Sequence, residues 1–208
     1  MESPKIEEVK KEYDEFADKY AAANFQNPLQ YQLSEFCSLL PKKDKASIKI
    51  LDVGCGPGRD VEYLMEEGYD VFGIDFSEEM IKVAKKLVQD GKFEVADFTK
   101  KDFEENSFSG IWCNATLLHL PREEVKEIFD KFLKWLEPQG ILFVSMLEGE
   151  GQRELRIKRF YQNSLTAYFY QLNELIQLLE NKGFEIIKYY NEYDFENNWI
   201  DVFCRKPE

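Results

Sequence analysis

The sequence predicts an α/β fold with a doubly wound, mainly parallel sheet of seven strands, an antiparallel last strand and a helical segment before the sheet. Three observations predict this class. Strand patterns alternate with helical patterns from residue 48 onward, which is typical of parallel βαβ units. The apolar run at 50–53 breaks into a glycine turn, as at the ligand-binding edge of such sheets. The runs at 184–190 and 199–205 are joined by a loop too short for a parallel crossover, so they are expected to be antiparallel.

The individual elements follow from the spacing of apolar residues and from turn signals. An amphipathic helix is predicted over 5–23, and Asn27 and Pro28 separate it from a second helix over 29–40. Arg59 begins a helix after the glycine turn, and Ser77 is the expected N-cap of the next one. Further helices are predicted at 122–136 and 171–181. Strands are predicted at 50–53, 70–75, 93–98, 111–115, 141–144, 184–190 and 199–205.

The turn after the first strand has glycine at alternate positions, Gly54, Gly56 and Gly58. Glycine accepts positive φ and has no Cβ, so the backbone turns sharply there and approaches a ligand closely. A dinucleotide fingerprint needs a sixth-position glycine, but counting from Gly54 that position is Arg59. Asp75 ends the second strand, where a carboxylate accepts the hydrogen bonds of a ribose diol. The pattern indicates a nucleoside ligand and makes an NAD-dependent dehydrogenase the weakest hypothesis.

Asp52, placed just before the alternating glycines, resembles motif I of class I S-adenosylmethionine-dependent methyltransferases. Passages similar to this superfamily then occur in order at 76–80, 93–98, 111–115 and 138–144. In the last of these, Gln139 stands where the first glycine of a PGG turn is common. The resemblance extends from about residue 10 to the C-terminus. It implies a Rossmann-like methyltransferase fold with S-adenosyl-L-methionine as the cofactor.

The resemblance also implies which residues bind the cofactor. They are Asp52, Gly54, Cys55, Gly56, Gly58, Arg59, Asp75, Phe76, Asp97, Phe98 and Asn114. The glycine turn is expected to cradle the methionyl and ribose portion, and Asp75 to bind the ribose hydroxyls. Asp97 and Phe98 are expected to hold the adenine.

The remaining cofactor residues have alternatives that the sequence leaves open. Asp52 either orients the turn or reaches the methionine ammonium through water, and the Asn114 carbonyl is expected to meet that ammonium. Arg59 either meets the methionine carboxylate or is a helix-surface arginine without such a role. Cys55 lies inside the turn and is expected to pack there as a small side chain.

A histidine and two tyrosines are candidates for catalysis. His119 is the only histidine, lies in the loop after the fourth strand, and has an ordinary pKa near neutrality that suits proton transfer. The alternative is a structural imidazole that closes a hydrogen bond in that loop. The resemblance places the aromatic residues of the first helix near the methyl group, which singles out Tyr20 together with Tyr13. Plain core packing predicts the same aromatic pattern.

The 208 residues are expected to form a single methyltransferase domain. Residues 1–45 would form an N-terminal helical lid, 46–147 the cofactor-binding half, and 148–208 a substrate-side insertion with the C-terminal hairpin. Residues 148–170 are predicted to be irregular, rich in charge and then in aromatics. The resemblance offers an alternative for part of this stretch, a short extended segment with aromatics before the helix at 171–181. Within 148–170, Arg153, Arg156, Lys158 and Arg159 form either a basic patch beside the site or an exposed face.

Composition narrows the function further. A formal net charge of −13 argues against a generic nucleic-acid binder. Four scattered cysteines indicate neither a metal site nor a disulfide framework, and no apolar run approaches a membrane span. No secretory signal pattern is found at the N-terminus, so a cytoplasmic protein is expected.

These observations favour a methyltransferase that acts by in-line displacement on a small-molecule acceptor. Two alternatives stay open. A protein or RNA methyltransferase would use the basic patch, although Asn114 is followed by Ala115 and not by an Asn-Pro-Pro-Tyr-like element. A non-catalytic S-adenosylmethionine-binding regulatory protein would keep the same cofactor residues. Neither the acceptor nor the oligomeric state follows from the sequence.

Overall fold

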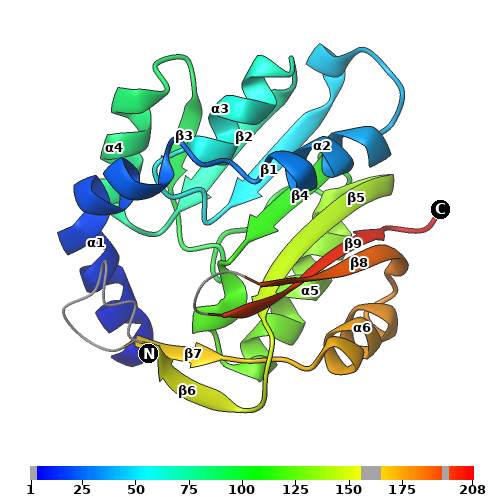
Figure 1. Ribbon diagram of the computed structural model, residues 1–208. Coiled ribbons are helices and arrows are strands. Elements are labelled where there is room, and N and C mark those ends of the chain that lie inside the picture. Colours follow the sequence, from blue (N-terminus) through cyan, green and yellow to red (C-terminus); the bar gives the residue numbers. More distant parts are fainter. Residues whose placement is uncertain (1–3, 156–164, 194–196) are drawn as a thin grey trace.

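The computed structural model, which describes residues 4–155, 165–193 and 197–208, contains a seven-stranded sheet around β1 (Lys49–Val53). The strand order is β3-β2-β1-β4-β5-β9-β8. The other strands are β2 (Asp70–Asp75), β3 (Lys92–Val95), β4 (Phe108–Asn114), β5 (Leu136–Leu147), β8 (Glu185–Tyr193) and β9 (Asn198–Arg205). The first five strands in the order are parallel, and β9 is antiparallel to both β5 and β8. The predicted fold class is confirmed (Figure 1).

Helices cover both faces of the sheet (Figure 1). One face shares an apolar cluster with α2 (Gln30–Leu39), α3 (Arg59–Glu66) and α4 (Glu78–Leu87), and the other with α5 (Arg122–Trp135) and α6 (Leu172–Asn181). Strand β1 is buried on both faces because its side chains alternate between the two clusters: Leu51 and Val53 join one, and Ile50 joins the other.

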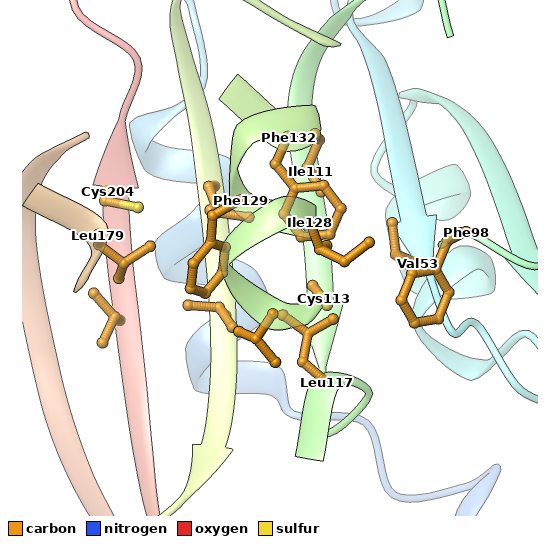
Figure 2. Close-up of a cluster of buried hydrophobic side chains, with 14 of the residues drawn as sticks. Val53, Phe98, Ile111, Cys113, Leu117, Ile128, Phe129, Phe132, Leu179 and Cys204 are labelled. Atoms are coloured by element: carbon orange, nitrogen blue, oxygen red, sulfur yellow. The ribbon is translucent and has the colours of Figure 1, made fainter. Parts of the chain in front are cut away.

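The core on the α5 side continues to the edge of the predicted cofactor site. Figure 2 shows Ile128, Phe129 and Phe132 of α5 over the sheet, with Leu179 to one side and Phe98 to the other. All five side chains are at least nine-tenths buried. Phe98 therefore belongs both to the packed interior and to the segment expected to contact the cofactor.

The N-terminal helix α1 (Pro4–Asn24) packs against α4 and the β7 segment, beside the carboxyl edge of the parallel strands (Figure 1). Its contact with α4 includes the apolar residues Ala17 and Ala21 against Met80 and Val83. It also includes a polar contact: an Asp14 carboxylate oxygen accepts hydrogen bonds from the Ser77 hydroxyl at 2.6 Å and from the Glu79 amide at 3.2 Å. Ser77 caps α4 as expected, since its hydroxyl also accepts from the Met80 amide. None of the described helices has the length and apolarity needed to cross a bilayer.

The prediction that 148–170 is irregular was wrong for part of the segment. Strands β6 (Gln152–Leu155) and β7 (Leu165–Tyr168) form a separate antiparallel pair. Leu165 and Ala167 are buried while Thr166 and Tyr168 are half-buried, a period-two alternation too short to stand out beside the charged residues. Of the basic patch, Arg156, Lys158 and Arg159 lie outside the described residues.

Two element boundaries also differ. Strand β3 ends at Val95 and not at Phe98, so Asp97 and Phe98 lie in the loop that follows it. Helix α5 ends at Trp135, and Leu136 already pairs with Phe108 of β4. The other predicted helices and strands are confirmed within a few residues of their ends.

Candidate functional site

The glycine turn connects β1 to α3 and forms hydrogen bonds with the carboxyl end of β2. The three glycines have positive φ values of 73°, 51° and 86°, and the Gly54 and Cys55 amides donate to the Ile74 carbonyl. A Cβ on Gly54 would lie 2.2 Å from the Thr116 hydroxyl oxygen, and one on Gly58 would lie 2.8 Å from the Phe93 ring, so these two glycines allow close packing. No atom lies within 4 Å of the corresponding position on Gly56. Gly56 thus leaves its space open for a ligand.

A cavity of about 930 Å³, including its mouth, opens beside this turn. Of the predicted residues, the cavity is lined by Tyr20, Asp52, Gly54, Cys55, Gly56, Arg59, Asp75, Phe76, Phe98, Asn114 and His119. Gly58 and Asp97 are not part of its lining. Among the described residues, no cluster of His, Cys, Asp or Glu is arranged to hold a metal ion.

Asp75 lies at the centre of the hydrogen bonds around the turn. One carboxylate oxygen accepts from the Ser77 amide and the other from the Gly56 amide, each at 2.9 Å. Burial raises the pKa of Asp75 to about 6, although these backbone bonds act in the opposite direction. A carboxylate accepts about four hydrogen bonds, so this side chain has acceptor capacity left for ribose hydroxyls.

Asp52 has a buried oxygen that needs a donor. Its side chain is 2% exposed, and its Oδ2 atom has no hydrogen-bond partner among the described residues. Burial raises its pKa well above the ordinary value. An unpartnered carboxylate oxygen beside a ligand cavity fits a ligand that brings a cationic donor, such as the methionine ammonium of the expected cofactor.

Arg59 is not a helix-surface arginine, because its side chain is only 17% exposed. It forms a two-pronged ion pair with Asp60, with Nε–Oδ1 and Nη2–Oδ2 distances of 2.6 and 2.9 Å. Its Nη1 donates to the Asn27 carbonyl at 3.2 Å, and Asp60 also accepts from the Trp112 indole at 2.9 Å. Asp60 was missed because an acid in the first turn of a helix usually faces solvent, whereas here it is 6% exposed.

Asp97 interacts with its own loop and does not line the cavity. Its Oδ1 atom accepts from the Thr99 amide at 3.0 Å and the Thr99 hydroxyl at 2.6 Å, and its Oδ2 atom pairs with Lys100 at 3.1 Å. Local turns of this kind compete for the carboxylate oxygens. The adenine contact predicted for Asp97 stays a prediction, while Phe98, the next residue, does line the cavity.

His119 and Tyr13 form a hydrogen-bonded pair in the cavity wall. The His119 Nδ1 atom lies 3.4 Å from the Thr166 carbonyl, which only accepts, so Nδ1 carries the proton and Nε2 accepts from the Tyr13 hydroxyl at 3.1 Å. Loss of solvation lowers the pKa of His119 to about 4, so the near-neutral pKa expected from the sequence was wrong and the imidazole is neutral at pH 7. Tyr20 packs edge-on against Tyr13, and burial raises the pKa of Tyr20. The structural hydrogen bond and the cavity-facing position expected for His119 occur together.

A family model described as a methyltransferase domain matches residues 50–140, which span β1 to the start of β5 and include most of the cavity wall. Residues 50–140 are therefore a methyltransferase domain. The seven-stranded sheet that contains them has the fold of S-adenosylmethionine-dependent methyltransferases. Methyltransferases of this fold use S-adenosylmethionine, the cofactor that the family resemblance had implied.

Known proteins similar to this methyltransferase chain support the same assignment. Phosphoethanolamine N-methyltransferase 3 of Arabidopsis thaliana is 39% identical over 116 residues, which are 53% of this chain and 23% of that protein. The chain therefore spans less than a quarter of that relative. A methyltransferase from Methanosarcina mazei has a TM-score of 0.73 at 21% identity, covering 83% of this chain and 97% of the other.

A third comparison adds a protein solved with its ligands. Phosphoethanolamine N-methyltransferase 2 of Haemonchus contortus, in complex with phosphomonomethylethanolamine and S-adenosylhomocysteine, has a TM-score of 0.67 at 19% identity. The match covers 86% of this chain and 53% of that one. At this identity the likeness concerns the fold alone.

Proposed function

We propose that this chain transfers the methyl group of S-adenosylmethionine to a small-molecule nucleophile, with a phosphoethanolamine-type amine as the first acceptor to test. The observation that carries the proposal is the hydrogen-bonded pair Tyr13–His119, which lines the same cavity as the glycine turn. It supports a proton acceptor beside the methyl donor. The similarity to phosphoethanolamine N-methyltransferases supports an amine as the nucleophile.

The cofactor residues bind and orient in this mechanism. When bound, S-adenosylmethionine supplies a sulfonium-activated methyl group for in-line displacement by the acceptor lone pair. Asp75 accepts from the ribose hydroxyls, and the Asp52 carboxylate with the Asn114 carbonyl receives the ammonium. Tyr13 and Tyr20 of α1 cover the cavity and keep water from the reacting groups. No protein nucleophile is required.

The Tyr13–His119 pair removes the acceptor proton. An amine attacks only with a free lone pair, so an ammonium group must lose a proton before methyl transfer. The Tyr13 hydroxyl oxygen takes that proton as it passes its own to Nε2 of His119, which is unprotonated because Nδ1 is directed at Thr166. The Thr166 carbonyl holds the imidazole in the required tautomer.

The proposal is tested by measuring S-adenosylhomocysteine formation from S-adenosylmethionine with phosphoethanolamine, with ethanolamine and with a panel of small amines and alcohols. We expect product only with an added small-molecule acceptor. Product formation with protein or RNA and none with the panel would favour a protein or RNA methyltransferase that uses the basic patch. Of that patch the structure describes only Arg153, whose guanidinium lies over the Phe169 ring at 4.6 Å from its centroid. Cofactor binding without turnover on any acceptor would indicate a regulatory protein.

A further inference from the structure

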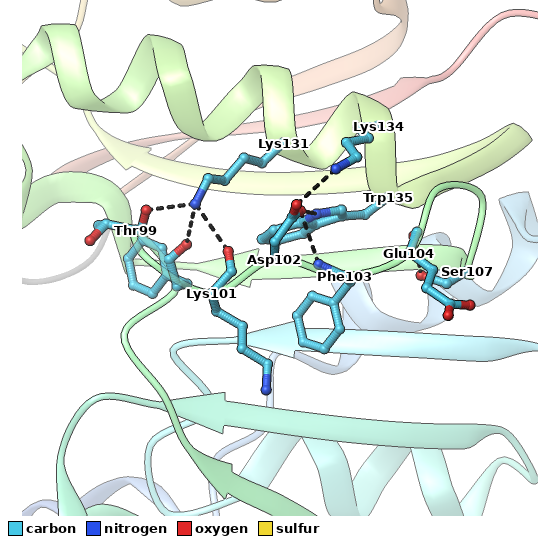
Figure 3. Close-up of polar contacts among 10 residues, drawn as sticks. Thr99, Lys101, Asp102, Phe103, Glu104, Ser107, Lys131, Lys134 and Trp135 are labelled. Carbon is cyan, nitrogen blue, oxygen red and sulfur yellow. Dashed lines mark hydrogen bonds and ion pairs between the residues drawn. The ribbon is translucent and has the colours of Figure 1, made fainter.

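Lys131, on α5, donates hydrogen bonds to three backbone carbonyls of the loop between β3 and β4 (Figure 3). Its ammonium lies 2.6 Å from the Thr99 oxygen, 3.0 Å from that of Lys101 and 3.4 Å from that of Phe98. An ammonium has three N–H donors, so this set uses all of them. Such a complete set of backbone partners is unusual for a lysine that could otherwise extend into solvent.

The loop needs a donor at this place because of how it turns. The Asp97 carbonyl accepts from both the Lys100 and Lys101 amides, at 3.0 and 2.8 Å, which closes a tight turn over 97–101. The carbonyls that follow Asp97 then converge on α5, as carbonyls do at the end of a helix. Converging carbonyl dipoles without donors destabilise a partly buried loop, and a single cation satisfies all three.

The loop also forms part of the cofactor cavity. Among residues 92–103, all of which are described, Phe98 is the one that lines the cavity, and it is 7% exposed. Its backbone carbonyl is one of the three that Lys131 holds. A shift of the 98–101 backbone would therefore move the cavity wall directly.

We propose that Lys131 is a positioning residue for the cofactor: by holding the carbonyls of Phe98, Thr99 and Lys101, it fixes the Phe98 wall of the cavity in its binding position. This inference rests on the S-adenosylmethionine site of the proposed function, but it needs no particular acceptor. Lys131 contacts neither the cavity nor the reacting groups, so its effect is on cofactor binding and not on the chemical step.

A second lysine on the same helix offers a matched control. Lys134 lies one turn further along α5 and pairs with Asp102 at 2.8 Å, at the part of the loop leading away from the cavity (Figure 3). Asp102 also accepts from the Trp135 indole at 2.8 Å, and these bonds lower its pKa to about 2. Lys134 thus joins the same loop to the same helix without holding the Phe98 carbonyl.

The test is the affinity for S-adenosylhomocysteine, measured by titration calorimetry on the full chain. Lys131→Met is expected to raise the Kd about tenfold, because the charged donor to three carbonyls is lost, whereas Lys134→Met stays within about twofold of wild type. Lys131→Arg keeps a multiple donor and is expected to stay within about threefold. With any acceptor that turns over, Lys131→Met is expected to raise KM for S-adenosylmethionine while kcat at saturation stays within about twofold.

An unchanged Kd in Lys131→Met, or equal losses in Lys131→Met and Lys134→Met, would overturn the proposal. Should Lys131→Met fail to fold by circular dichroism, Lys131→Gln replaces it: a Kd raised above that of Lys134→Met supports the proposal, and an unchanged Kd overturns it. Lack of turnover with phosphoethanolamine would contradict only the proposed acceptor, because the Kd values of the lysine variants are measured without an acceptor. Wild-type protein that does not bind S-adenosylhomocysteine would overturn both.

Discussion

At the residue scale, His119 has a structural hydrogen bond and is also the proton acceptor of the proposed relay. Its Nδ1 atom is directed at the Thr166 carbonyl, which leaves Nε2 to the Tyr13 hydroxyl. We expect His119→Ala to lower turnover by about a hundredfold or more while the affinity for S-adenosylhomocysteine stays within about twofold, because the imidazole serves the acceptor proton and not the cofactor. Initial rates and calorimetry on one preparation check this. Near-normal turnover would remove His119 from catalysis.

Tyr13→Phe separates the two members of the pair. It removes the hydroxyl that joins the acceptor side of the cavity to His119 and keeps the ring that packs against Tyr20 and Phe76 at 6.1 Å. The proposed relay predicts a fall in turnover of about tenfold to a hundredfold with little change in melting temperature. Tyr20→Phe is the control, since its hydroxyl has no role in the relay. An equal loss in both variants would contradict a specific role for Tyr13.

Asp75 is expected to make cofactor binding depend on pH. Burial places its pKa at about 6 in the free protein, above the ordinary value of 3.8, so the folded protein holds this proton more tightly than the unfolded chain. The stability contributed by the protonated form is therefore present at low pH and is lost as pH rises from about 4 to 6. Ribose hydroxyls donate hydrogen bonds and therefore favour the ionised form of Asp75. The affinity for the cofactor is thus expected to rise as pH increases, whereas this contribution to folding stability falls.

If only ionised Asp75 binds the diol, affinity for S-adenosylhomocysteine falls about tenfold between pH 7.5 and pH 5. Asp75→Asn has no such ionisation and is expected to bind more weakly at pH 7.5, with a flatter pH profile. Calorimetry of both proteins across this range measures the difference. Parallel profiles would show that another group, such as buried Asp52, controls the dependence.

At the scale of elements, one carboxylate of α1 forms hydrogen bonds with the start of α4 beside the site. Asp14 accepts from the Ser77 hydroxyl and the Glu79 amide, and the Ser77 amide donates to Asp75. Asp14→Ala leaves a capping hydroxyl without its acceptor and is expected to cost about 1 kcal/mol of stability, with faster amide exchange in α1. Asp18→Ala, at an exposed position on the same helix, is the control. Equal exchange in the two variants would show that apolar packing alone holds α1.

Elements with a strong local pattern were predictable, and those that depend on distant partners were not. Ser77 as an N-cap and the glycine turn follow from short-range chemistry, and the structure confirms both elements. The bounds and pairing of strand β7 were not predicted from its residues, because its buried alternation covers only four of them, Leu165–Tyr168. At the residue scale, burial of Asp60 depends on Trp112, which is 52 residues away along the chain.

For the whole molecule, parallel topology explains which part of the site was predictable. Asp52, Asp75 and Asn114 occur at or near the carboxyl ends of β1, β2 and β4, which are neighbours in the sheet, so their proximity follows from strand order alone. The Tyr13–His119 contact joins residues 106 positions apart. It depends on the path of α1 across the sheet edge, and helical periodicity carries no information on that path.

The charge of the whole molecule predicts how the site distinguishes substrate cofactor from product. The chain has a formal net charge of −13, and Asp52, Asp60 and Asp75 line the cavity with one arginine, Arg59. S-adenosylmethionine carries one more positive charge than S-adenosylhomocysteine, so this field favours the substrate and assists product release. Salt screens that preference.

Raising NaCl from about 20 mM to about 300 mM is therefore expected to weaken S-adenosylmethionine binding about threefold more than S-adenosylhomocysteine binding. Competition calorimetry at the two salt concentrations measures the ratio of the two affinities, and contacts common to both ligands cancel in it. Asp60→Asn removes one cavity carboxylate and is expected to reduce the salt dependence of the ratio. A ratio that does not change with salt would mean that the sulfonium lies beyond the influence of these carboxylates.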